Sequence, residues 1–362
     1  MKAKVNRKKL YEAASKAAKV LKKGISTTSN ALYLEVKEEK IYFSGVQAQM
    51  AICTSTEDVT FDEPFSCLFD VDLFLPIMAK IKQVEVTLEY LEDKNQLVIW
   101  GGKTSMNLTC IDKNQWTPMK TLECPDLIME TETLFPYITQ CKHALPTNEQ
   151  DNVMSSFYVE HGNDAWKITA LDGRRISSRG EIQKTECAVL LNGSSMTTLE
   201  NIFTNGKVTL TIQEEDVQIE DDATKVLLRS VSGNYFNIKQ LISNDAKYYV
   251  TVNREELLDV VELADIAVHN VSEKGIKLTF DGEKNRLLVE ANDVIGNHVK
   301  SEVDISCLEP FSMQMGINAK YLIDALKNVS DETLTLELIS DVAPIIFRGD
   351  AYLEVVLPIK IR

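Results

Sequence analysis

The chain repeats one arrangement of helices and strands three times, about once every 120 residues. In each repeat a short amphipathic helix precedes alternating strands, and a second short helix leads directly into another alternating strand. The first helices are expected at residues 6–23, 131–145 and 253–268. The second helices are expected at residues 71–81, 194–203 and 318–329. Self-similarity at this spacing indicates three copies of one structural unit in a single chain.

The strand segments alternate apolar and polar residues, which is typical of half-buried strands. They are expected at residues 32–36, 84–88, 157–159, 207–212, 276–280 and 333–338. Short polar turns, such as residues 161–164 and 281–284, separate successive strands. Hairpins joined by such turns give antiparallel sheets, so the sequence predicts an α+β fold.

A length of 362 residues accommodates three domains, which we expect at residues 1–124, 125–245 and 246–362. The segments that join them, near residues 116–126 and 243–247, are polar and short. Because neither joint is long or of low complexity, we expect the domains to keep a fixed relative orientation.

The composition is that of a globular protein, with 44% hydrophobic and 26% charged residues. No apolar run is long enough for a membrane span, and the N-terminus carries no signal-peptide core, so a cytoplasmic location is expected. The seven cysteines are widely spaced without a Cys-x-x-Cys motif, and there are only four histidines. This favours reduced, mostly buried thiols over disulfides or a metal site.

The net charge of −15 is unevenly distributed. Residues 1–124 carry 17 basic and 16 acidic residues, whereas the remainder carries 22 and 38. In the first helix an apolar stripe of Leu10, Ala14, Ala17 and Leu21 lies opposite Lys9, Lys16, Lys19 and Lys23. In a lone helix, a solvated face is the more usual explanation for such a row of lysines. A polyanion would nevertheless be tolerated best at the first domain.

Three segments resemble a known family. Residues 169–176, Thr-Ala-Leu-Asp-Gly-Arg-Arg-Ile, resemble the Ala-Thr-Asp-Gly-His-Arg-Leu turn of bacterial sliding clamps, the beta subunits of the replicative DNA polymerase. Residues 316–326 are similar to that family's Gly-Phe-Asn-Ala-Arg-Tyr-Leu-Leu-Asp-Ala-Leu, and residues 355–362 to its Val-Val-Met-Pro-Met-Arg-Leu terminus. With the threefold repeat, the resemblance covers essentially the whole chain.

The resemblance implies a DNA clamp fold and a head-to-tail homodimer whose six domains close a ring around double-stranded DNA. Two helices per domain would lie inside and antiparallel sheets outside. A ring held by its topology needs only weak, sequence-independent phosphate contacts. The lysines that would face DNA are Lys9, Lys16, Lys19, Lys22, Lys23, Lys80 and Lys82. No cofactor is implied.

The resemblance also implies a shallow apolar cleft between the middle and C-terminal domains. DNA polymerase, the clamp loader and repair proteins would insert short linear peptides there, with a few apolar anchors filling pockets. The implied cleft residues are Met154, Leu171, Gly173, Arg174, Arg175, Ile176, Phe236, Gln240, Leu241, Val355, Leu357, Pro358 and Ile359. Taken alone, residues 357–359 also suit an edge strand, and Asp172–Gly173 suits an ordinary tight turn.

The sequence departs from the family pattern at several positions. Phe236 stands where clamps usually have a proline and Gln240 where they have an arginine, so the cleft is bulkier and less cationic. Residues 26–29 replace a segment resembling Leu-Pro-x-Leu. The first helix of the third domain presents Glu255, Asp259 and Glu262 on one face, which would repel phosphate over a Debye length of roughly 8–10 Å.

By resemblance, the dimer contact would bring Lys103, Met106 and Leu108 of one protomer to Ala267 and Val268 of its partner. A mixed apolar and charged patch suits a head-to-tail contact between identical chains.

The sequence therefore predicts a sliding clamp that tethers a DNA polymerase and confers processivity. The alternative is a clamp-like paralogue that recruits or regulates partners without productive encirclement of DNA, which the acidic helix and the altered cleft would suit. An enzyme is not supported. Asp172 has no second carboxylate at motif spacing, no phosphate-binding Gly-Lys loop occurs, and no Cys/His or Ser/His pair stands in a recognisable motif.

Overall fold

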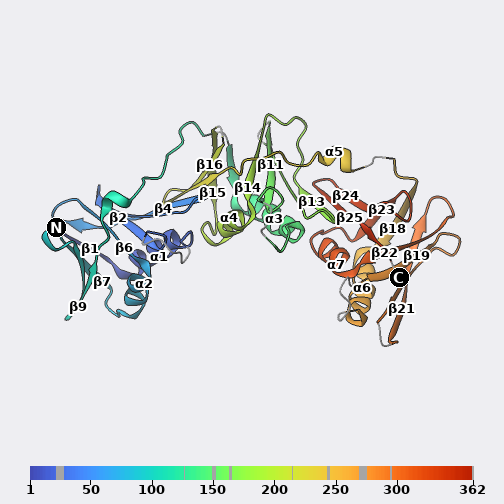
Figure 1. Cartoon of the computed structure of the whole chain (residues 1–362), viewed down its shortest axis with the longest axis horizontal. Coiled ribbons are helices and arrows are strands. Elements are labelled where there is room, and N and C mark those ends of the chain that lie inside the picture. The colour runs from blue at the N-terminus through green and yellow to red at the C-terminus, as the bar shows by residue number, and fades with distance from the viewer. Residues whose placement is uncertain are drawn as a thin grey trace. The chain divides into compact units, whose positions relative to one another are not determined.

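The structure is a computed structural model that forms two compact units (Figure 1). The first unit comprises Met1–Phe135 and Ser194–Ser230, and the second comprises Pro136–Gly193 and Val231–Arg362. The residues described are 1–21, 28–125, 127–148, 152–162, 165–213, 215–242, 245–268, 275–293 and 296–360. The middle third of the chain thus contributes strands to both units.

The first unit contains two antiparallel sheets within its described residues. The smaller has the order β5 (Thr60–Phe61), β1 (Lys2–Asn6), β7 (Glu85–Leu91), β8 (Gln96–Gly101), β9 (Thr104–Thr109). The larger has the order β10 (Leu127–Glu130), β15 (Lys207–Gln213), β16 (Asp216–Glu220), β17 (Thr224–Arg229), β4 (Met50–Thr56), β3 (Lys40–Val46), β2 (Ala31–Lys37), β6 (Phe65–Asp70). The pairing of β17 with β4 makes this sheet continuous between distant parts of the chain.

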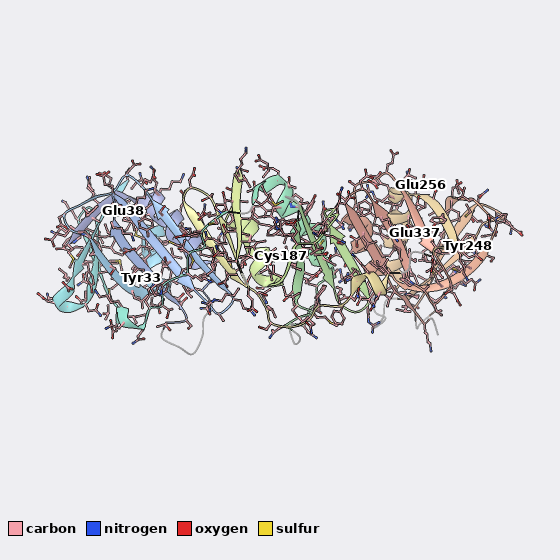
Figure 2. The ribbon with its side chains drawn as sticks, turned by 90° about the horizontal axis from the view of Figure 1, so that it is seen from above. Tyr33, Glu38, Cys187, Tyr248, Glu256 and Glu337 are labelled. Atoms are coloured by element: carbon pink, nitrogen blue, oxygen red, sulfur yellow. The ribbon has the colours of Figure 1, made fainter. Side chains whose placement is uncertain are left out.

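The second unit is built on one long antiparallel sheet. Its order is β14 (Cys187–Asn192), β11 (Ser156–Gly162), β12 (Ala165–Leu171), β13 (Arg175–Arg179), β25 (Tyr352–Val356), β24 (Ile345–Gly349), β23 (Thr333–Leu338), β18 (Tyr248–Asn253), β21 (His298–Cys307), β20 (Arg286–Asn292), β19 (Gly275–Asp281), β22 (Ser312–Asn318), β26 (Pro358–Ile359). Figure 2 shows Tyr248 and Glu337 on the neighbouring strands β18 and β23. The pairing of β13 with β25 joins the middle of the chain to its C-terminal segment.

The helices are short, and all of those described except α5 follow a strand directly. They are α1 (Arg7–Ala18), α2 (Val71–Lys80), α3 (Thr131–Cys141), α4 (Gly193–Thr198), α5 (Ile238–Leu241), α6 (Arg254–Ala267) and α7 (Ala319–Lys327). Five of these begin after an Asn or Asp whose side chain accepts a hydrogen bond from a backbone N–H group of the first turn, namely Asn6, Asp70, Asn237, Asn253 and Asn318. Such caps satisfy otherwise unpaired donors and fix where each helix starts.

The fold class predicted from the sequence is confirmed, because helices accompany sheets whose strand pairings are antiparallel throughout the described residues. All six predicted helices are present. The third and fourth continue into short 3₁₀ turns, η3 (Lys142–Ala144) and η4 (Leu199–Asn201). Helix α1 ends at Ala18, earlier than predicted, and α5 was not predicted. The division at residues 124 and 245 stays a prediction.

The helices pack through the apolar stripes that the sequence indicated. Leu10, Ala14 and Ala17 of α1 are fully buried. Helix α6 buries Leu257, Val261 and Ala264 in the main core of the second unit. Their polar faces remain at the surface of each unit. No helix in the described part of the chain is long and apolar enough to cross a membrane.

The seven cysteines are present as free thiols in very different environments. Cys67, Cys110 and Cys141 are buried, Cys124 is exposed, and the other three are half-buried. Burial raises the pKa of the Cys141 thiol to about 12 and the pKa of the Cys67 thiol well above its usual value. Since the thiolate is the reactive form, these two thiols are protected by both burial and protonation.

We therefore expect N-ethylmaleimide at pH 8 to alkylate Cys124 first in the folded protein. Cys141 and Cys67 should react only when urea unfolds the chain. Peptide mapping by mass spectrometry over a time course measures each rate, with fully unfolded protein as the control. Equal labelling rates for Cys141 and Cys124 under native conditions would contradict this burial pattern.

Candidate functional site

A small apolar cluster in the second unit is separate from the main core. Its buried members are Leu171, Ile176, Ile346 and Val355. They come from β12, β13, β24 and β25, which are neighbours in the sheet. Half-buried side chains of Met154, Tyr235, Ile238, Ile242 and Leu353 pack against them. The cluster, which we call the cleft cluster, thus combines four adjacent strands with the segment around α5.

The turn between β12 and β13 places two members of the cleft cluster opposite each other. Asp172 Oδ1 accepts hydrogen bonds from the backbone N–H groups of Arg174 and Arg175 at 2.9 and 3.0 Å. Gly173 adopts a φ of +83°, which a side chain would disfavour. This tight turn pairs Leu171 with Ile176 across the two strands.

Three large apolar side chains beside the cleft cluster are accessible. Phe236 is 40% exposed, Leu241 is 52% exposed and Leu357 is 37% exposed. The backbone N–H of Leu357 donates to the carbonyl of Arg174 at 2.9 Å, which ties the C-terminal segment to the turn. Adjacent exposed apolar groups around a buried apolar base are the arrangement that short peptides use as anchor sites.

An aromatic stack supports one side of this site. The Tyr158 and Tyr235 rings are stacked with centroids 4.9 Å apart, and Phe236 meets Tyr235 edge-on at 5.8 Å. Burial raises the pKa of the Tyr235 hydroxyl, so this ring stays neutral. Tyr235 therefore holds Phe236 at the surface, where the family pattern has a proline.

The predicted cleft residues occupy several different environments. Met154, Leu171, Ile176 and Val355 come together in the cleft cluster, and Leu357, Phe236 and Leu241 lie beside it. Gly173, Arg174 and Gln240 are exposed in the turn and in α5. Pro358 and Ile359 form the edge strand β26 on β22, as the plainer interpretation of the C-terminal segment expected.

Arg175 is a member of the predicted set that lies on the other face of the sheet. Its side chain is only 8% exposed and pairs with Asp172 Oδ2 at 2.9 Å and Asp324 Oδ2 at 2.7 Å. Its guanidinium also lies 4.4 Å from the centre of the Tyr321 ring. Arg175 therefore supports the site from behind and links β13 to α7.

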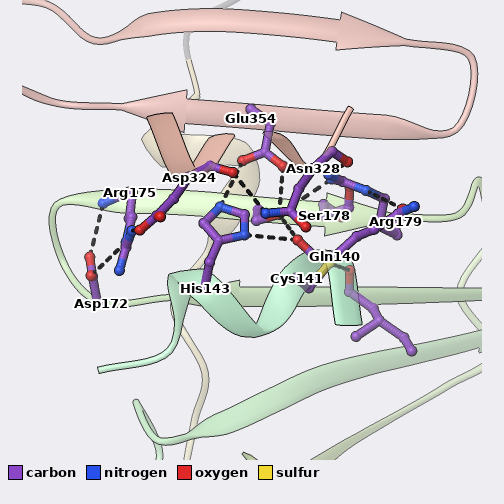
Figure 3. A network of polar contacts seen from close by, with 12 residues as sticks. Gln140, Cys141, His143, Asp172, Arg175, Ser178, Arg179, Asp324, Asn328 and Glu354 are labelled. Carbon is purple, nitrogen blue, oxygen red and sulfur yellow. Dashed lines mark hydrogen bonds and ion pairs between the residues drawn. The ribbon is translucent and has the colours of Figure 1, made fainter. Parts of the chain in front are cut away.

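The same face of β13 carries a polar network that the sequence did not reveal (Figure 3). Arg179 Nη2 lies 2.7 Å from Glu354 Oε1 and donates to the Asn328 carbonyl at 2.7 Å. Its Nε donates to Gln140 Oε1 at 2.9 Å. Both side chains of the Arg179–Glu354 pair are at most 3% exposed. Arg179 Nη1 donates to the Ser178 carbonyl at 2.8 Å, so each nitrogen of the Arg179 guanidinium has a hydrogen-bond partner.

Two further side chains complete the shell around Glu354. The Ser177 hydroxyl donates to Glu354 Oε1 at 2.7 Å, and His143 Nε2 lies 3.3 Å from Oε2. Figure 3 shows His143 and Gln140, from the end of α3 and η3, converging with Glu354 and Arg179. We call these contacts the buried ionic network. A glutamate inside the otherwise apolar strand Tyr352–Val356 was the sequence signal for it.

The predicted DNA-facing lysines lie in the first unit. Lys9 is ion-paired with Asp58, and this carboxylate raises the pKa of Lys9. Lys19 donates to the Asn201 carbonyl, and partial burial lowers the pKa of Lys19. Lys16 is half-buried, and Lys80 and Lys82 are exposed. Lys22 and Lys23 lie outside the described residues.

The acidic face of α6 is partly neutralised. Glu255 and Asp259 are exposed, but Glu255 lies 3.1 Å from Arg254 Nη2. Glu262 lies 2.6 Å from Lys327 Nζ on α7. The helix is therefore less repulsive to an anion than its sequence alone indicates.

The residues predicted at the dimer contact differ in exposure. Lys103 is exposed, and Met106, on the edge strand β9, is 42% exposed. Ala267 is half-buried, whereas Leu108 and Val268 are 5% and 0% exposed. Leu108 and Val268 belong to the cores of their own units and do not present their side chains to a partner.

Replacing Asp324 by alanine leaves Arg175 with Asp172 as its remaining carboxylate. We expect a loss of about 1.5–3 kcal/mol in the free energy of unfolding, because a buried charged donor loses an acceptor. Lys327→Ala, which breaks an exposed pair, is the control and should cost under about 1 kcal/mol. Urea unfolding followed by circular dichroism measures both. Equal losses would refute a special role for the buried pair.

Comparisons with known proteins cover both ends of the chain. Residues 1–120 match the N-terminal domain of the DNA polymerase III beta subunit, and residues 239–359 match its C-terminal domain. The "Beta sliding clamp" of Lactococcus lactis is 23% identical over 356 residues, which is 91% of each chain. That of Staphylococcus aureus is 23% identical over 351 residues, which is 90% of each chain.

Solved structures show the same fold. The DNA polymerase sliding clamp from Bacillus subtilis superimposes with a TM-score of 0.91 at 20% identity, over 100% of both chains. The beta subunit from DNA polymerase of Streptococcus pyogenes gives a TM-score of 0.90 at 20% identity, also over 100% of both chains. The chain belongs to the family of the DNA polymerase III beta subunit.

Proposed function

We propose that this chain is a DNA sliding clamp that encircles duplex DNA and tethers a DNA polymerase and other partners to it. The observation that carries the proposal, beyond membership of the family, is the cleft cluster with its accessible apolar side chains. The cleft cluster draws on segments around residues 169–176, 231–242 and 353–359, and two of the three family motifs, at residues 169–176 and 355–362, fall on the first and last of them.

Partner recognition follows from the shape and chemistry of the cleft. An extended peptide would cover Phe236, Leu241 and Leu357 with apolar side chains, and a few well-buried anchors would provide most of the affinity. The exposed Arg174 and Gln240 would lie at its polar rim. The polymerase, the clamp loader and repair proteins would compete for this one site with short linear peptides.

Contact with DNA would be weak and independent of sequence. The net charge of −15 opposes tight binding of a polyanion. Lys9 and Lys19 are already engaged within the protein, so Lys16, Lys80 and Lys82 are the better candidates among the described lysines for transient phosphate contacts. Retention on DNA would come from closure of the ring, which leaves the clamp free to slide along the duplex.

Ring closure would require a head-to-tail homodimer of three-domain protomers, with domains at 1–124, 125–245 and 246–362. The exposed edge strand β9, with Lys103 and Met106, would provide one side of the contact. The other side would lie near Ala267 in the C-terminal part of the chain. In a head-to-tail contact, each protomer uses two different surfaces. Copies joined in this way form a closed ring when the rotation from one copy to the next brings the last copy back to the first.

The role would be mechanical and without catalysis or a cofactor, in the cytoplasm, where DNA is replicated. The carboxylate of Asp172, the candidate that an enzyme hypothesis would use, is occupied by the turn and by Arg175. It is therefore poorly placed to bind a metal ion or to act as a base.

A clamp-like paralogue that recruits partners without productive encirclement is the second candidate. The exposed Glu255 and Asp259 on α6, and Phe236 beside the cleft cluster, are the features that such a paralogue would use. Stimulation of processive synthesis by a cognate polymerase separates the two functions, since only the encircling clamp would provide it.

Leu357→Asp should abolish that stimulation. Placing a charge among the apolar anchors should weaken partner binding by about 2 kcal/mol or more, or about 30-fold in Kd. Primer extension on a long single-stranded template, with the cognate polymerase and loader, measures the product length.

Leu308→Asp is the matched control, because Leu308 is 86% exposed in the same unit but lies outside the cleft cluster. It should leave product length unchanged. Both variants should keep a solution mass of twice 40.7 kDa. Full activity of Leu357→Asp would refute the cleft, and a monomeric mass for the wild type would refute the ring.

A further inference from the structure

The strand pair β13–β25 has two chemically different faces. Side chains alternate along a strand, so successive residues point to opposite sides of the sheet. Ile176 and Val355 face the cleft cluster. Arg179 and Glu354 lie on the opposite face, in the buried ionic network, and Arg175 lies on that face with Asp324. One pair of strands therefore forms the floor of the cleft and carries the network behind it.

The network links β13 and β25, the two strands under the cleft cluster, through their side chains. Glu354 is separated by 175 residues from Arg179, yet their side chains are in direct contact. Arg179 also binds the Asn328 carbonyl at the end of α7 and Gln140 at the end of α3. The β12–β13 and β24–β25 hairpins, whose inner strands are paired through their backbones, are thus also linked by side chains and tied to two helices.

Stability alone does not explain this network. Two charges lose their hydration when buried, and apolar residues of similar size often give equal or greater stability. The ion pair adds a geometric constraint. The guanidinium is planar and donates hydrogen bonds only along its N–H bonds, so its acceptors must lie at fixed positions. Arg179 meets Glu354, Asn328 and Gln140 along three such directions, which defines where β25 lies against β13.

We propose that Arg179 and Glu354 are positioning residues for partner binding. They hold β25 so that the accessible Leu357 keeps its place over the buried base of Val355, Leu171 and Ile176 when a peptide binds, although neither charged side chain touches that peptide. The inference rests on the proposed role of the cleft, and it adds the residues that set the geometry of the cleft from the opposite face of the sheet.

The test replaces the ion pair by apolar residues, Arg179→Met with Glu354→Leu. The probe is a linear peptide selected by phage display against the wild-type protein and rejected by Leu357→Asp. Its Kd is measured by fluorescence anisotropy, and Tm is measured on the same samples. We expect the double variant to keep its Tm within about 5 °C of the wild type. Its Kd should rise by about tenfold or more.

The matched control removes an ion pair far along the same sheet, Lys277→Met with Glu290→Leu, whose charged atoms lie 2.9 Å apart. It should leave the Kd unchanged. Ser177→Ala is a milder variant should the double variant fail to fold, because it removes only the hydroxyl that donates to Glu354. It should raise the Kd by about threefold with little change in Tm.

A wild-type Kd in the folded double variant would overturn the positioning role. If the double variant does not fold, a wild-type Kd in Ser177→Ala would overturn it instead. Failure to select any peptide that depends on Leu357 would instead overturn the proposed function of the cleft. The two failures are distinguishable because the second appears with the wild-type protein alone.

Discussion

The antiparallel pairing of β13 with β25 is the contact on which the candidate site depends. It brings residues 175–179 beside residues 352–356 in one register, from Arg175 opposite Val356 to Arg179 opposite Tyr352. On one face this register assembles an apolar cluster from segments far apart in the sequence. On the other face it buries an arginine and a glutamate side by side. A change in this register would separate both the apolar cluster on one face and the ion pair on the other.

The charge of the protein is consistent with retention by shape. A polyanion is bound tightly when many lysines and arginines release its counterions. Here Lys9 is paired within the protein and Lys19 is bound to a backbone carbonyl, while Glu262 on α6 is neutralised by Lys327. Neither attraction nor repulsion dominates at these described surfaces. Such a surface suits a protein that must stay on DNA and still move along it.

Local features of the fold could be predicted from the sequence, and long-range contacts could not. The capped helices after Asn6 and Asn253 follow from short-range patterns, and the Asp172–Gly173 turn follows from turn chemistry. Leu171 and Val355 were placed together only by family motifs. The partners of Arg175 and Glu354, which are Asp324 and Arg179, were missed, because a sequence shows strand parity but not which element lies opposite. Helix α5 was missed because four residues give no periodicity.

The half-life of the protein on closed circular DNA, compared with the same DNA after linearisation, tests the central claim most directly. The protein is loaded onto a nicked circle, and the complex is isolated by gel filtration before a restriction enzyme cuts the DNA once. We predict stable retention on the circle over many minutes and loss from the ends after cutting. Equal rates of loss before and after cutting would contradict a clamp held by topology.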